Sequence, residues 1–373
     1  MNNLKKFNSK AEYQAWKDGD DYVFPNICKV GEEVVYNDYP EPFWIEALED
    51  ITVDFKYYNG NSNTSVGSYS FDKISWTNMP YGGVVVRTGQ KLYIIHGSLS
   101  YNKLVISGKF NVGGSILSLD YSLDYLQYTT HKNNNFNLFS DAKQVVSAKD
   151  LVLAIPRTSY SGLFYKCALL VDSPKLIGKI KNFDVSLEYA YKGCTSLTKA
   201  PTIPELKSGD YTSYGLTEMF KGCSNLSYIK ALFTQSFGSN YNSTKDWVDG
   251  VSPTGTFIAN YKRTDFTRGV SAIPEGWDLY LYDEENDRYV VKFKVNNIPY
   301  EFYTDEPRDV QWDEFCRSEY NTNGFTYPVG SPYGPVKNGS DFILLNGNQV
   351  MEDDKIVLNA SYTIGQLTAT TEE

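Results

Sequence analysis

Three cysteines at matching positions in successive segments are the residues with the clearest potential for chemistry. Cys167, Cys194 and Cys223 recur at steps of 27 and 29 residues. A zinc site would need thiolates and imidazoles at short spacings, but there is no Cys-x-x-Cys pair and the only histidines are His96 and His131. The odd total of 5 cysteines does not suit a disulfide framework. We therefore expect these thiols to be small buried core groups, and we predict no metal site and no cofactor.

The other candidates for chemistry are the histidines, paired carboxylates and one polar loop. The two histidines lie in an apolar strand pattern and in a polar loop, which does not favour a Ser-His-Asp arrangement. Acidic pairs at 49–50 and 353–354 have the residue types of a glycosidase pair, but solvated surface charge is the simpler interpretation. Residues 319–330 imitate the start of a calcium loop, yet Gly330 stands where a bidentate Glu is required. We predict no catalytic residues and expect the chain not to be an enzyme.

The cysteines belong to a repeat that runs from about residue 136 to residue 277. Each copy has an aromatic ring, then a small residue, then an aliphatic residue at fixed offsets, and the small position recurs at steps of 25, 27 and 29 residues from Ala142 onward. This period is typical of a leucine-rich-repeat-like solenoid, in which stacked turns close a common core. The residues expected in the repeat core are Leu138, Phe139, Ala142, Phe164, Cys167, Leu170, Tyr191, Cys194, Leu197, Phe220, Cys223 and Leu226.

The repeat is expected to end in a tail without the period, beginning near residue 246. Solenoids need an atypical last turn to cover the open end of the core. Trp247, Phe257 and Trp277 are expected to form this cap.

A chain of 373 residues is too long for one hydrophobic core. The pattern predicts a mainly β protein with an N-terminal arm, a β-sandwich-like domain, a short irregular leucine-rich-repeat solenoid and a small C-terminal β-rich (α+β) module. The expected boundaries are 1–40 for an attachment segment, 41–115 for the β-sandwich-like domain, 116–280 for the repeat block with its capping end, and 287–367 for the C-terminal module, which follows an acidic linker at 283–286.

Period-two alternation and turn residues predict the strands on either side of the repeat. Alternation at 51–56 indicates a half-buried strand, and another run is expected at 69–76. Residues 84–86 and 92–95 are interpreted as more fully buried strands.

In the C-terminal module, hairpins are expected around Asn296-Asn297 and Asn346-Gly347. A short helix at 310–316 would bring Trp312, Phe315 and Cys316 to one face.

The net charge of −10 argues against nucleic acid and against an anionic membrane surface as partners. No apolar run approaches the roughly 20 residues needed to cross a bilayer, so no membrane insertion is expected. The first residues lack the apolar segment of a secretion signal. The 31 tyrosines suit half-buried β faces and contact surfaces.

Two repeat segments resemble the BspA-type leucine-rich repeats of gut Bacteroidales and their phages. Residues 191–201 read Tyr-Lys-Gly-Cys-Thr-Ser-Leu-Thr-Lys-Ala-Pro, and residues 219–226 read Met-Phe-Lys-Gly-Cys-Ser-Asn-Leu. The closing segments at 247–257 and 273–277 are similar to the usual ending of those arrays. This array departs from the family because it is short and irregular, with Ala142 in place of the first cysteine.

The chain opens with Leu4-Lys5-Lys6-Phe7, followed by Ala11-Glu12-Tyr13 and Pro25-Asn26, and this start resembles the head of structural proteins from crAss-like and related Bacteroides phages. The C-terminal stretch with Trp312, residues 320–325 and residues 345–347 resembles a small β-rich module common in such virion proteins. Together the resemblances imply a virion protein that is assembled in the bacterial cytoplasm, most directly a capsid-attached head fibre or decoration protein. They imply other virion proteins as partners, a homo-oligomer (dimer or trimer) and contact with host surface glycans. A tail fibre, a bacterial surface adhesin and a carbohydrate-active virion enzyme are the alternatives. The residues expected to attach the chain to the particle are Leu4, Phe7, Tyr13, Trp16 and Phe24.

Overall fold

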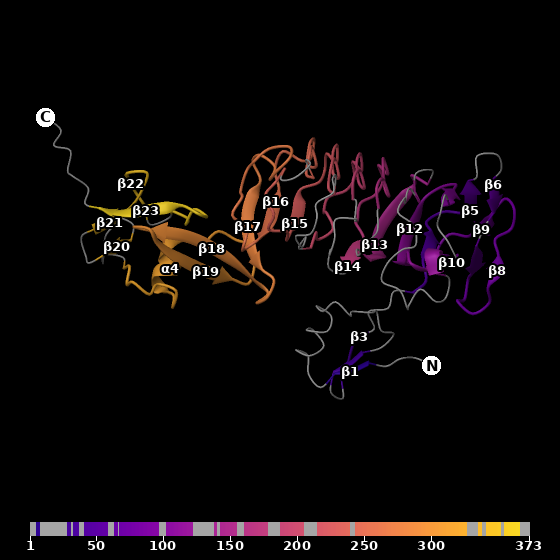
Figure 1. Ribbon diagram of the computed structural model, residues 1–373, viewed down its shortest axis with the longest axis horizontal. Coiled ribbons are helices and arrows are strands. Elements are labelled where there is room, and N and C mark those ends of the chain that lie inside the picture. The colour runs from indigo at the N-terminus through magenta and orange to yellow at the C-terminus, as the bar shows by residue number, and fades with distance from the viewer. Residues whose placement is uncertain are drawn as a thin grey trace. The chain divides into compact units, whose positions relative to one another are not determined.

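The computed structural model is mainly β, as the sequence predicted (Figure 1). It describes main chain and side chains at 41–55, 67–96, 103–119, 138–139, 142–153, 160–176, 187–204, 215–238, 243–326, 335–337, 341–351 and 354–365, with only the main chain of a few further strand and helix residues. Two compact units form: residues 1–257 with 263–278, and residues 258–262 with 279–373.

Most of the predicted attachment segment lies outside the described residues. Within it, β1 (Lys5–Phe7) pairs in parallel with β2 (Cys28–Val30), which pairs antiparallel with β3 (Glu33–Tyr36). The side chains of the five predicted attachment residues are not among those described, and neither are His131 and Asp353.

Two sheets follow in the first unit. A seven-stranded sheet has the order β14-β13-β12-β4-β10-β7-β8, and a four-stranded sheet has the order β11-β5-β6, with β9 also paired to β5. Their bounds are β4 (Trp44–Ala47), β5 (Ile51–Tyr58), β6 (Asn63–Ser65), β7 (Ser68–Ser70), β8 (Thr77–Asn78), β9 (Val84–Val86), β10 (Lys91–Ile95), β11 (Asn102–Ile106), β12 (Phe110–Ser115), β13 (Val145–Ala154) and β14 (Lys175–Ile177), with the short helix α2 (Ser118–Tyr121) after β12.

The seven-stranded sheet continues across the boundary expected at residue 115. Strand β12 pairs antiparallel with β4 on one edge and in parallel with β13 on the other. The first strand of the repeat region is therefore hydrogen-bonded to the same sheet as the strands before it.

The single strand predicted at 69–76 is wrong. Strand β7 ends at Ser70, and the Asp72 carboxylate accepts hydrogen bonds from the main-chain N–H groups of Ile74 (2.8 Å) and Ser75 (2.7 Å). Local side-chain hydrogen bonds of this kind favour a turn over a strand. Ile74 is consequently 84% exposed.

Strand β9 also differs from the prediction, because only two of its three valines are buried. Val84 and Val86 point inward, whereas Val85 is 55% exposed. The strand therefore has one solvent-facing side and is not buried on both faces.

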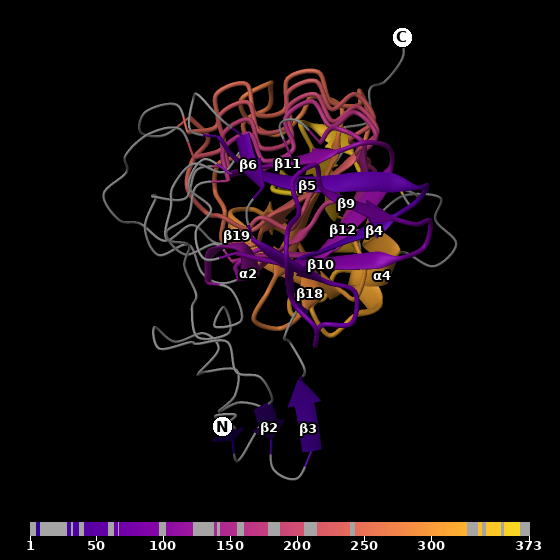
Figure 2. The same ribbon diagram turned by 90° about the vertical axis from the view of Figure 1, so that its right-hand side faces the viewer.

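The rest of the first unit is a series of stacked turns. Isolated parallel bridges join Ser147 to Asp172, Asp172 to Lys199 and Lys199 to Tyr228, at the start of β15 (Tyr228–Ala231). The turns lie side by side in Figure 1, and they overlie one another in the perpendicular view of Figure 2. Each turn is thus joined to the next by a parallel bridge.

The second unit contains two hairpins that the sequence predicted. Strand β18 (Arg288–Val295) pairs with β19 (Ile298–Thr304) around Asn296 and Asn297, which both have positive φ. Strand β21 (Asp341–Leu345) pairs with β22 (Asn348–Gln349) around Asn346 and Gly347, again with positive φ. Asn and Gly adopt this backbone conformation readily, and two-residue hairpin turns require it. Both predicted hairpins are confirmed.

The remaining elements of this unit are β17 (Asp278–Asp283), helix α4 (Trp312–Arg317), β20 (Val336–Lys337) and β23 (Ser361–Gly365). Strand β16 (Thr256–Asn260) begins in the first unit and ends in the second. Strand β23 pairs in parallel with β18 and antiparallel with β21.

The acidic linker expected at 283–286 is a tight turn instead. It joins β17 to β18, and Asp283 is paired with Arg288 in the strand register. The Asp283 carboxylate is buried and accepts hydrogen bonds from the main chain of Glu285 (3.1 Å) and the side chain of Asn286 (2.7 Å). An acidic run can therefore be the hydrogen-bonded core of a turn, which composition alone does not reveal.

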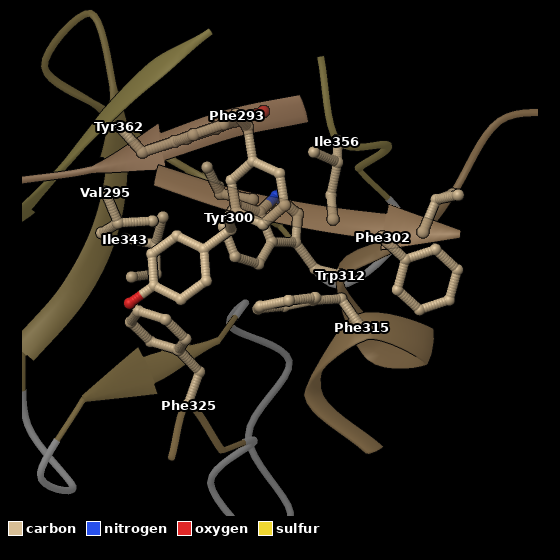
Figure 3. Packing of buried hydrophobic residues seen from close by; sticks show 12 residues of the cluster. Phe293, Val295, Tyr300, Phe302, Trp312, Phe315, Phe325, Ile343, Ile356 and Tyr362 are labelled. Atoms are coloured by element: carbon tan, nitrogen blue, oxygen red, sulfur yellow. The ribbon is translucent and has the colours of Figure 1, made fainter. Parts of the chain in front are cut away.

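Aromatic rings dominate the core of the second unit (Figure 3). The predicted helix forms as α4 and presents Trp312 and Phe315, both 0% exposed, while Cys316 is half-buried beside them. The Trp312 ring meets Phe293 at 5.3 Å and Tyr362 at 4.9 Å, both edge to face. This arrangement is the preferred geometry for aromatic pairs.

Candidate functional site

The stacked turns of the first unit bring the predicted repeat residues together. All twelve residues of the predicted repeat core are at most 1% exposed. Their rings form a column in which Phe139 stacks on Phe164 (4.9 Å between centroids), Phe164 on Tyr191 (5.5 Å) and Tyr191 on Phe220 (5.5 Å). We call this column the aromatic ladder. Its interplanar angles of 8°, 20° and 23° show that each turn repeats the orientation of the turn before it.

Main-chain hydrogen bonds explain this regularity. In the turn at 187–193, the N–H groups of Leu187, Tyr189, Tyr191 and Gly193 donate to carbonyls of the next turn over 2.8–3.0 Å. Every second residue donates, which is the pattern of a parallel strand pair. Each ring is therefore held at the same height in its turn as the ring in the neighbouring turn.

Each turn also has two positions with a left-handed backbone. One is occupied by Lys166, Gly193, Gly222 and Gly250, with φ of 60°, 78°, 76° and 75°. The other is occupied by Gly162, Tyr189, Glu218 and Asp246. Glycine adopts this conformation without the steric cost that Cβ imposes, which accounts for the recurring Gly of the Lys-Gly-Cys motif.

The repeated cysteines lie directly behind the aromatic ladder. The Cys194 thiol donates to the carbonyl of Phe164 (3.1 Å), and the Cys223 thiol donates to the carbonyl of Tyr191 (3.0 Å). Burial raises the pKa of the Cys167 and Cys223 thiols to about 12, and it also raises the pKa of Cys194 well above its usual value. Thiols with such a raised pKa are poor nucleophiles and poor metal ligands at neutral pH. The hydrogen bonds of Cys194 and Cys223 join one turn to the previous one.

The repeat continues one turn further than the sequence predicted. The N–H groups of Phe220 and Gly222 donate to the carbonyls of Trp247 (2.8 Å) and Asp249 (2.7 Å), so residues 243–250 form a fifth turn. In this register, Val248 takes the place of the aromatic residue. The prediction that the repeat gives way to a tail near residue 246 is therefore wrong. The sequence pattern does not show the fifth turn, because an aliphatic side chain replaces the characteristic ring.

Trp247 covers the ladder from the neighbouring position in that fifth turn. Its ring lies 6.1 Å from Phe220 and 6.2 Å from Phe257, and its indole N–H donates to the carbonyl of Ala272 (2.8 Å). The Trp277 indole N–H donates to the carbonyl of Ser252 (2.8 Å). All three residues predicted to form the cap are buried at this end of the ladder.

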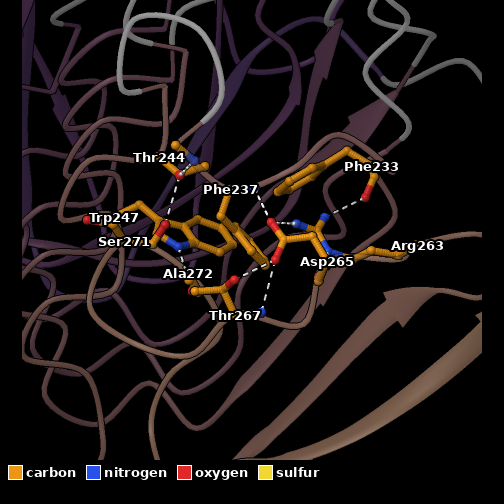
Figure 4. Close-up of polar contacts among 10 residues, drawn as sticks. Phe233, Phe237, Thr244, Trp247, Arg263, Asp265, Thr267, Ser271 and Ala272 are labelled. Carbon is orange, nitrogen blue, oxygen red and sulfur yellow. Dashed lines mark hydrogen bonds and ion pairs between the residues drawn. The ribbon is translucent and has the colours of Figure 1, made fainter. Parts of the chain in front are cut away.

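A buried arginine beside the cap was not found from the sequence (Figure 4). The Arg263 guanidinium lies 3.7 Å from the centroid of the Phe237 ring and donates to the carbonyl oxygens of Phe233 (2.9 Å) and Asp265 (2.7 Å). The Asp265 carboxylate in turn accepts hydrogen bonds from the main chain of Phe237 (2.7 Å) and from the Thr267 hydroxyl (2.6 Å). No repeat position or spacing marks this group in the sequence.

The electrostatics of this group are consistent with a fixed ionic contact. Burial raises the pKa of the Asp265 carboxyl, but the hydrogen bonds from Thr267 and Phe237 and the charge of Arg263 more than offset it, so the pKa lies below the usual value. The carboxylate is thus charged at neutral pH and fixes the main chain of Phe237 beside the cap.

The remaining candidates for chemistry have structural contacts. Glu49 accepts from the main chain of Lys109 (2.9 Å), and Asp50 accepts from the main chain of Thr88 (3.0 Å). The Thr88 hydrogen bond, followed by that of Arg87, lowers the pKa of Asp50. His96 packs edge to face on Phe55 at 5.6 Å. These contacts fix turns and strands.

The loop that imitates a calcium site uses its polar groups internally where it is described. The Asn321 side chain bonds the main chain of Cys316 and Phe325, and the Asn323 amide donates to the Tyr300 hydroxyl (2.5 Å). Within the described part of the chain, no group of three or more His, Cys, Asp or Glu side chains is arranged to hold a metal ion.

Comparisons with models of protein families, with curated proteins and with solved structures found no match to this chain. Among the described helices, none is long and apolar enough to cross a membrane.

Proposed function

We propose that this chain is a non-enzymatic structural protein of a phage particle, most directly a head fibre or decoration protein attached to the capsid. The observation that carries the proposal is that the residues on which the resemblance depends are also residues of the buried repeat core. The two segments that resemble the BspA-type repeats of Bacteroidales and their phages, 191–201 and 219–226, supply two rings of the aromatic ladder (Tyr191 and Phe220) and the two thiol contacts of Cys194 and Cys223.

A scaffold of this kind suits a structural role in a particle. Each turn is joined to the next by main-chain hydrogen bonds and buried rings. The thiols of Cys194 and Cys223 donate to main-chain carbonyls of the preceding turn, and burial raises the pKa of both. In such arrays each turn contacts only its neighbours, so the outer face can vary without loss of the core. The outer face is then available for contacts with other virion proteins and with host surface glycans.

We assign attachment to residues 1–40, because this segment precedes the seven-stranded sheet and contains Leu4, Phe7, Tyr13, Trp16 and Phe24. The test is a particle assembled with a chain that lacks residues 1–40. We expect the truncated chain to keep its β-sheet circular dichroism and to be absent from purified particles. A chain that lacks residues 366–373 is the matched control and should be incorporated normally. Normal incorporation of the chain without residues 1–40 would contradict this assignment.

A carbohydrate-active virion enzyme is the competing class. Incubation of the full chain with Bacteroides capsular polysaccharide distinguishes the two, since an enzyme of this class releases reducing ends. We expect no release. A reconstruction of the intact particle would then separate a head fibre from a tail fibre by the position of the chain.

A further inference from the structure

The described part of the second unit contains two Asn-Gly pairs, Asn323-Gly324 and Asn346-Gly347, and all four residues are exposed. In such a pair the main-chain nitrogen of the glycine can attack the side-chain amide of the asparagine, because glycine has no Cβ to hinder the approach. The two pairs have the same sequence chemistry. Their reactivity therefore depends on how the structure holds each amide and each nitrogen.

Both reacting groups of the first pair are held by hydrogen bonds. The Asn323 amide donates to the Tyr300 hydroxyl (2.5 Å), and the Gly324 N–H donates to the carbonyl of Asn321 (3.3 Å). Asn321 is fixed in turn, because its side-chain oxygen accepts a hydrogen bond from the main chain of Phe325 (2.9 Å). Attack of the Gly324 nitrogen on the Asn323 amide must first break these contacts.

The reacting groups of the second pair are free. Among the described residues, neither the side-chain amide of Asn346 nor the N–H of Gly347 has a hydrogen-bond partner. A Cβ added to Gly347 would meet no atom within 4 Å, so the space beside this residue is open. The amide and the nitrogen are therefore accessible to each other and to water.

The turn that contains the second pair is also easily opened. Asn346 has a left-handed φ of 52°, a conformation with a steric cost for a residue that has a Cβ. The strand that follows, β22, consists of Asn348 and Gln349 only. Local opening of this turn thus relieves the left-handed conformation and gives up few contacts, and it lets Asn346 rotate its side chain toward the Gly347 nitrogen.

We propose that Asn346 is a site of spontaneous deamidation, with water as the co-reactant. The main-chain nitrogen of Gly347 bonds to Cγ of Asn346 and closes a succinimide, while the bond from Cγ to Nδ2 breaks and the amide nitrogen leaves as ammonia with the proton of the Gly347 N–H. Water then cleaves one of the two bonds between the ring nitrogen and a carbonyl carbon. Cleavage at Cγ gives aspartate, and cleavage at the main-chain carbonyl gives isoaspartate.

The modification changes the hairpin of β21 and β22. Both products add a negative charge to the turn, and isoaspartate also lengthens the main chain between Leu345 and Asn348, which are paired in the present register. Hairpin register depends on loop length, so β22 should lose its pairing in the isoaspartate form. The Val350 N–H, which donates to the carbonyl of Ile343 (2.9 Å), anchors the chain beyond it. This inference does not depend on the proposed function.

The test incubates the full chain at mildly alkaline pH and follows both asparagines by peptide mass spectrometry, with fragment ions to locate the modified residue. We expect deamidation at Asn346 to be about tenfold faster than at Asn323, because two further hydrogen bonds must break at Asn323. In urea, where neither pair is held, the two rates should come close to each other.

A pair of variants tests the role of the hydrogen bonds directly. Tyr300→Phe keeps the ring but removes the acceptor of the Asn323 amide, so it should raise the rate at Asn323 and leave the rate at Asn346 unchanged. The control Tyr303→Phe removes a hydroxyl of the same strand that bonds Glu301, and it should change neither rate. Circular dichroism checks that both variants are folded.

Three results would overturn the proposal. The first is deamidation of Asn323 that is as fast as that of Asn346 in the folded chain. The second is an equal rise at Asn323 in the two variants, and the third is a difference between the two sites that persists unchanged in urea.

Discussion

The aromatic ladder of the first unit and the aromatic core of the second bury their rings in two different ways. In the ladder, one ring per turn stacks nearly parallel on the next, with Tyr191 between Phe164 and Phe220. In the second unit, Trp312 meets Phe293, Phe315, Phe325 and Tyr362 at angles between 74° and 90°. Phe293 and Tyr362 come from β18 and β23, Phe325 comes from a loop, and Phe315 comes from helix α4 itself.

The difference lies in how far each contact extends through the structure. A ladder ring contacts the turn before and the turn after, so the energetic effect of its loss is confined to neighbouring turns. Trp312 joins elements between β18 and β23, so its loss affects the whole unit at once. The first unit is a sum of similar local contacts, and the second is one non-local core.

Removal of one ring from each region should give the largest effects and the clearest separation. Trp312→Ala is expected to destabilise the second unit by about 3–5 kcal/mol, because a large ring leaves a cavity in a core that cannot collapse fully. Phe220→Ala should cost less within the same range, since among the described residues its ring packs on those of Tyr191 and Trp247, in the two neighbouring turns. Hydrogen exchange followed by mass spectrometry reports each unit separately during urea unfolding.

The spread of the effect distinguishes the two regions more sharply than its size. Faster exchange should extend over β18, β19, β21 and β23 in Trp312→Ala, but should stay within the turns at 187–204 and 215–250 in Phe220→Ala. The exposed Gln311→Ala next to the tryptophan is the control and should leave exchange unchanged. Uniform loss of protection over the first unit in Phe220→Ala would contradict the description of the ladder as a sum of local contacts.

A backbone change in the ladder should have an intermediate effect. Gly222 has a φ of 76°, and an added Cβ would meet no atom closer than 3.9 Å, so Gly222→Ala acts through the backbone conformation alone. The left-handed conformation costs an L-residue about 1–2 kcal/mol, and the loss should be visible in the urea midpoint of the first unit. Lys166→Ala at the equivalent position of another turn already has a Cβ at φ 60° and should be nearly neutral.

The two regions also show which structural features could be predicted from the sequence. The ladder was predicted because its contacts join residues at a nearly constant separation, so Phe164, Tyr191 and Phe220 carry the same local signal. The fifth turn was missed because Val248 removes that signal while the hydrogen bonds remain. The hairpins at Asn296-Asn297 and Asn346-Gly347 were predicted because turn chemistry is local.

Non-local contacts left no such trace in the sequence. Arg263 is buried because Phe233 and Phe237, from a segment earlier in the chain, cover its guanidinium. Its burial therefore depends on a contact between distant segments, which no local pattern in the sequence marks.

The Tyr191 hydroxyl tests whether phenylalanine would be more stabilising than tyrosine at this position of the aromatic ladder. The Tyr191 hydroxyl is buried and has no hydrogen-bond partner among the described residues. A buried polar group without a partner costs about 1–3 kcal/mol. Phenylalanine occupies the same position in the turns of Phe164 and Phe220, so Tyr191→Phe should stabilise the first unit by about 1 kcal/mol, measured by its urea midpoint. Phe164→Tyr is the reverse test and should destabilise it; an unchanged midpoint in both would show that the hydroxyl is solvated.

The pH dependence of stability separates a fully buried thiol of the ladder from the half-buried Cys316 of the second unit. Burial raises the pKa of Cys223 from its ordinary value of 9.0 to about 12. Between these values only the unfolded chain loses the proton, so the thiol's contribution to stability is complete below pH 9 and falls as the pH rises toward 12. The stability difference between the unmodified chain and Cys223→Ala should therefore shrink by about 1 kcal/mol between pH 8 and pH 10. Burial also raises the pKa of Cys316 to about 12, but this side chain is partly exposed to water, which relieves part of the burial penalty on the thiolate, so Cys316→Ala should show a smaller change. Equal changes in stability for Cys223→Ala and Cys316→Ala would contradict this expectation, because they would show that the thiol of Cys223 is no better shielded from water than that of Cys316.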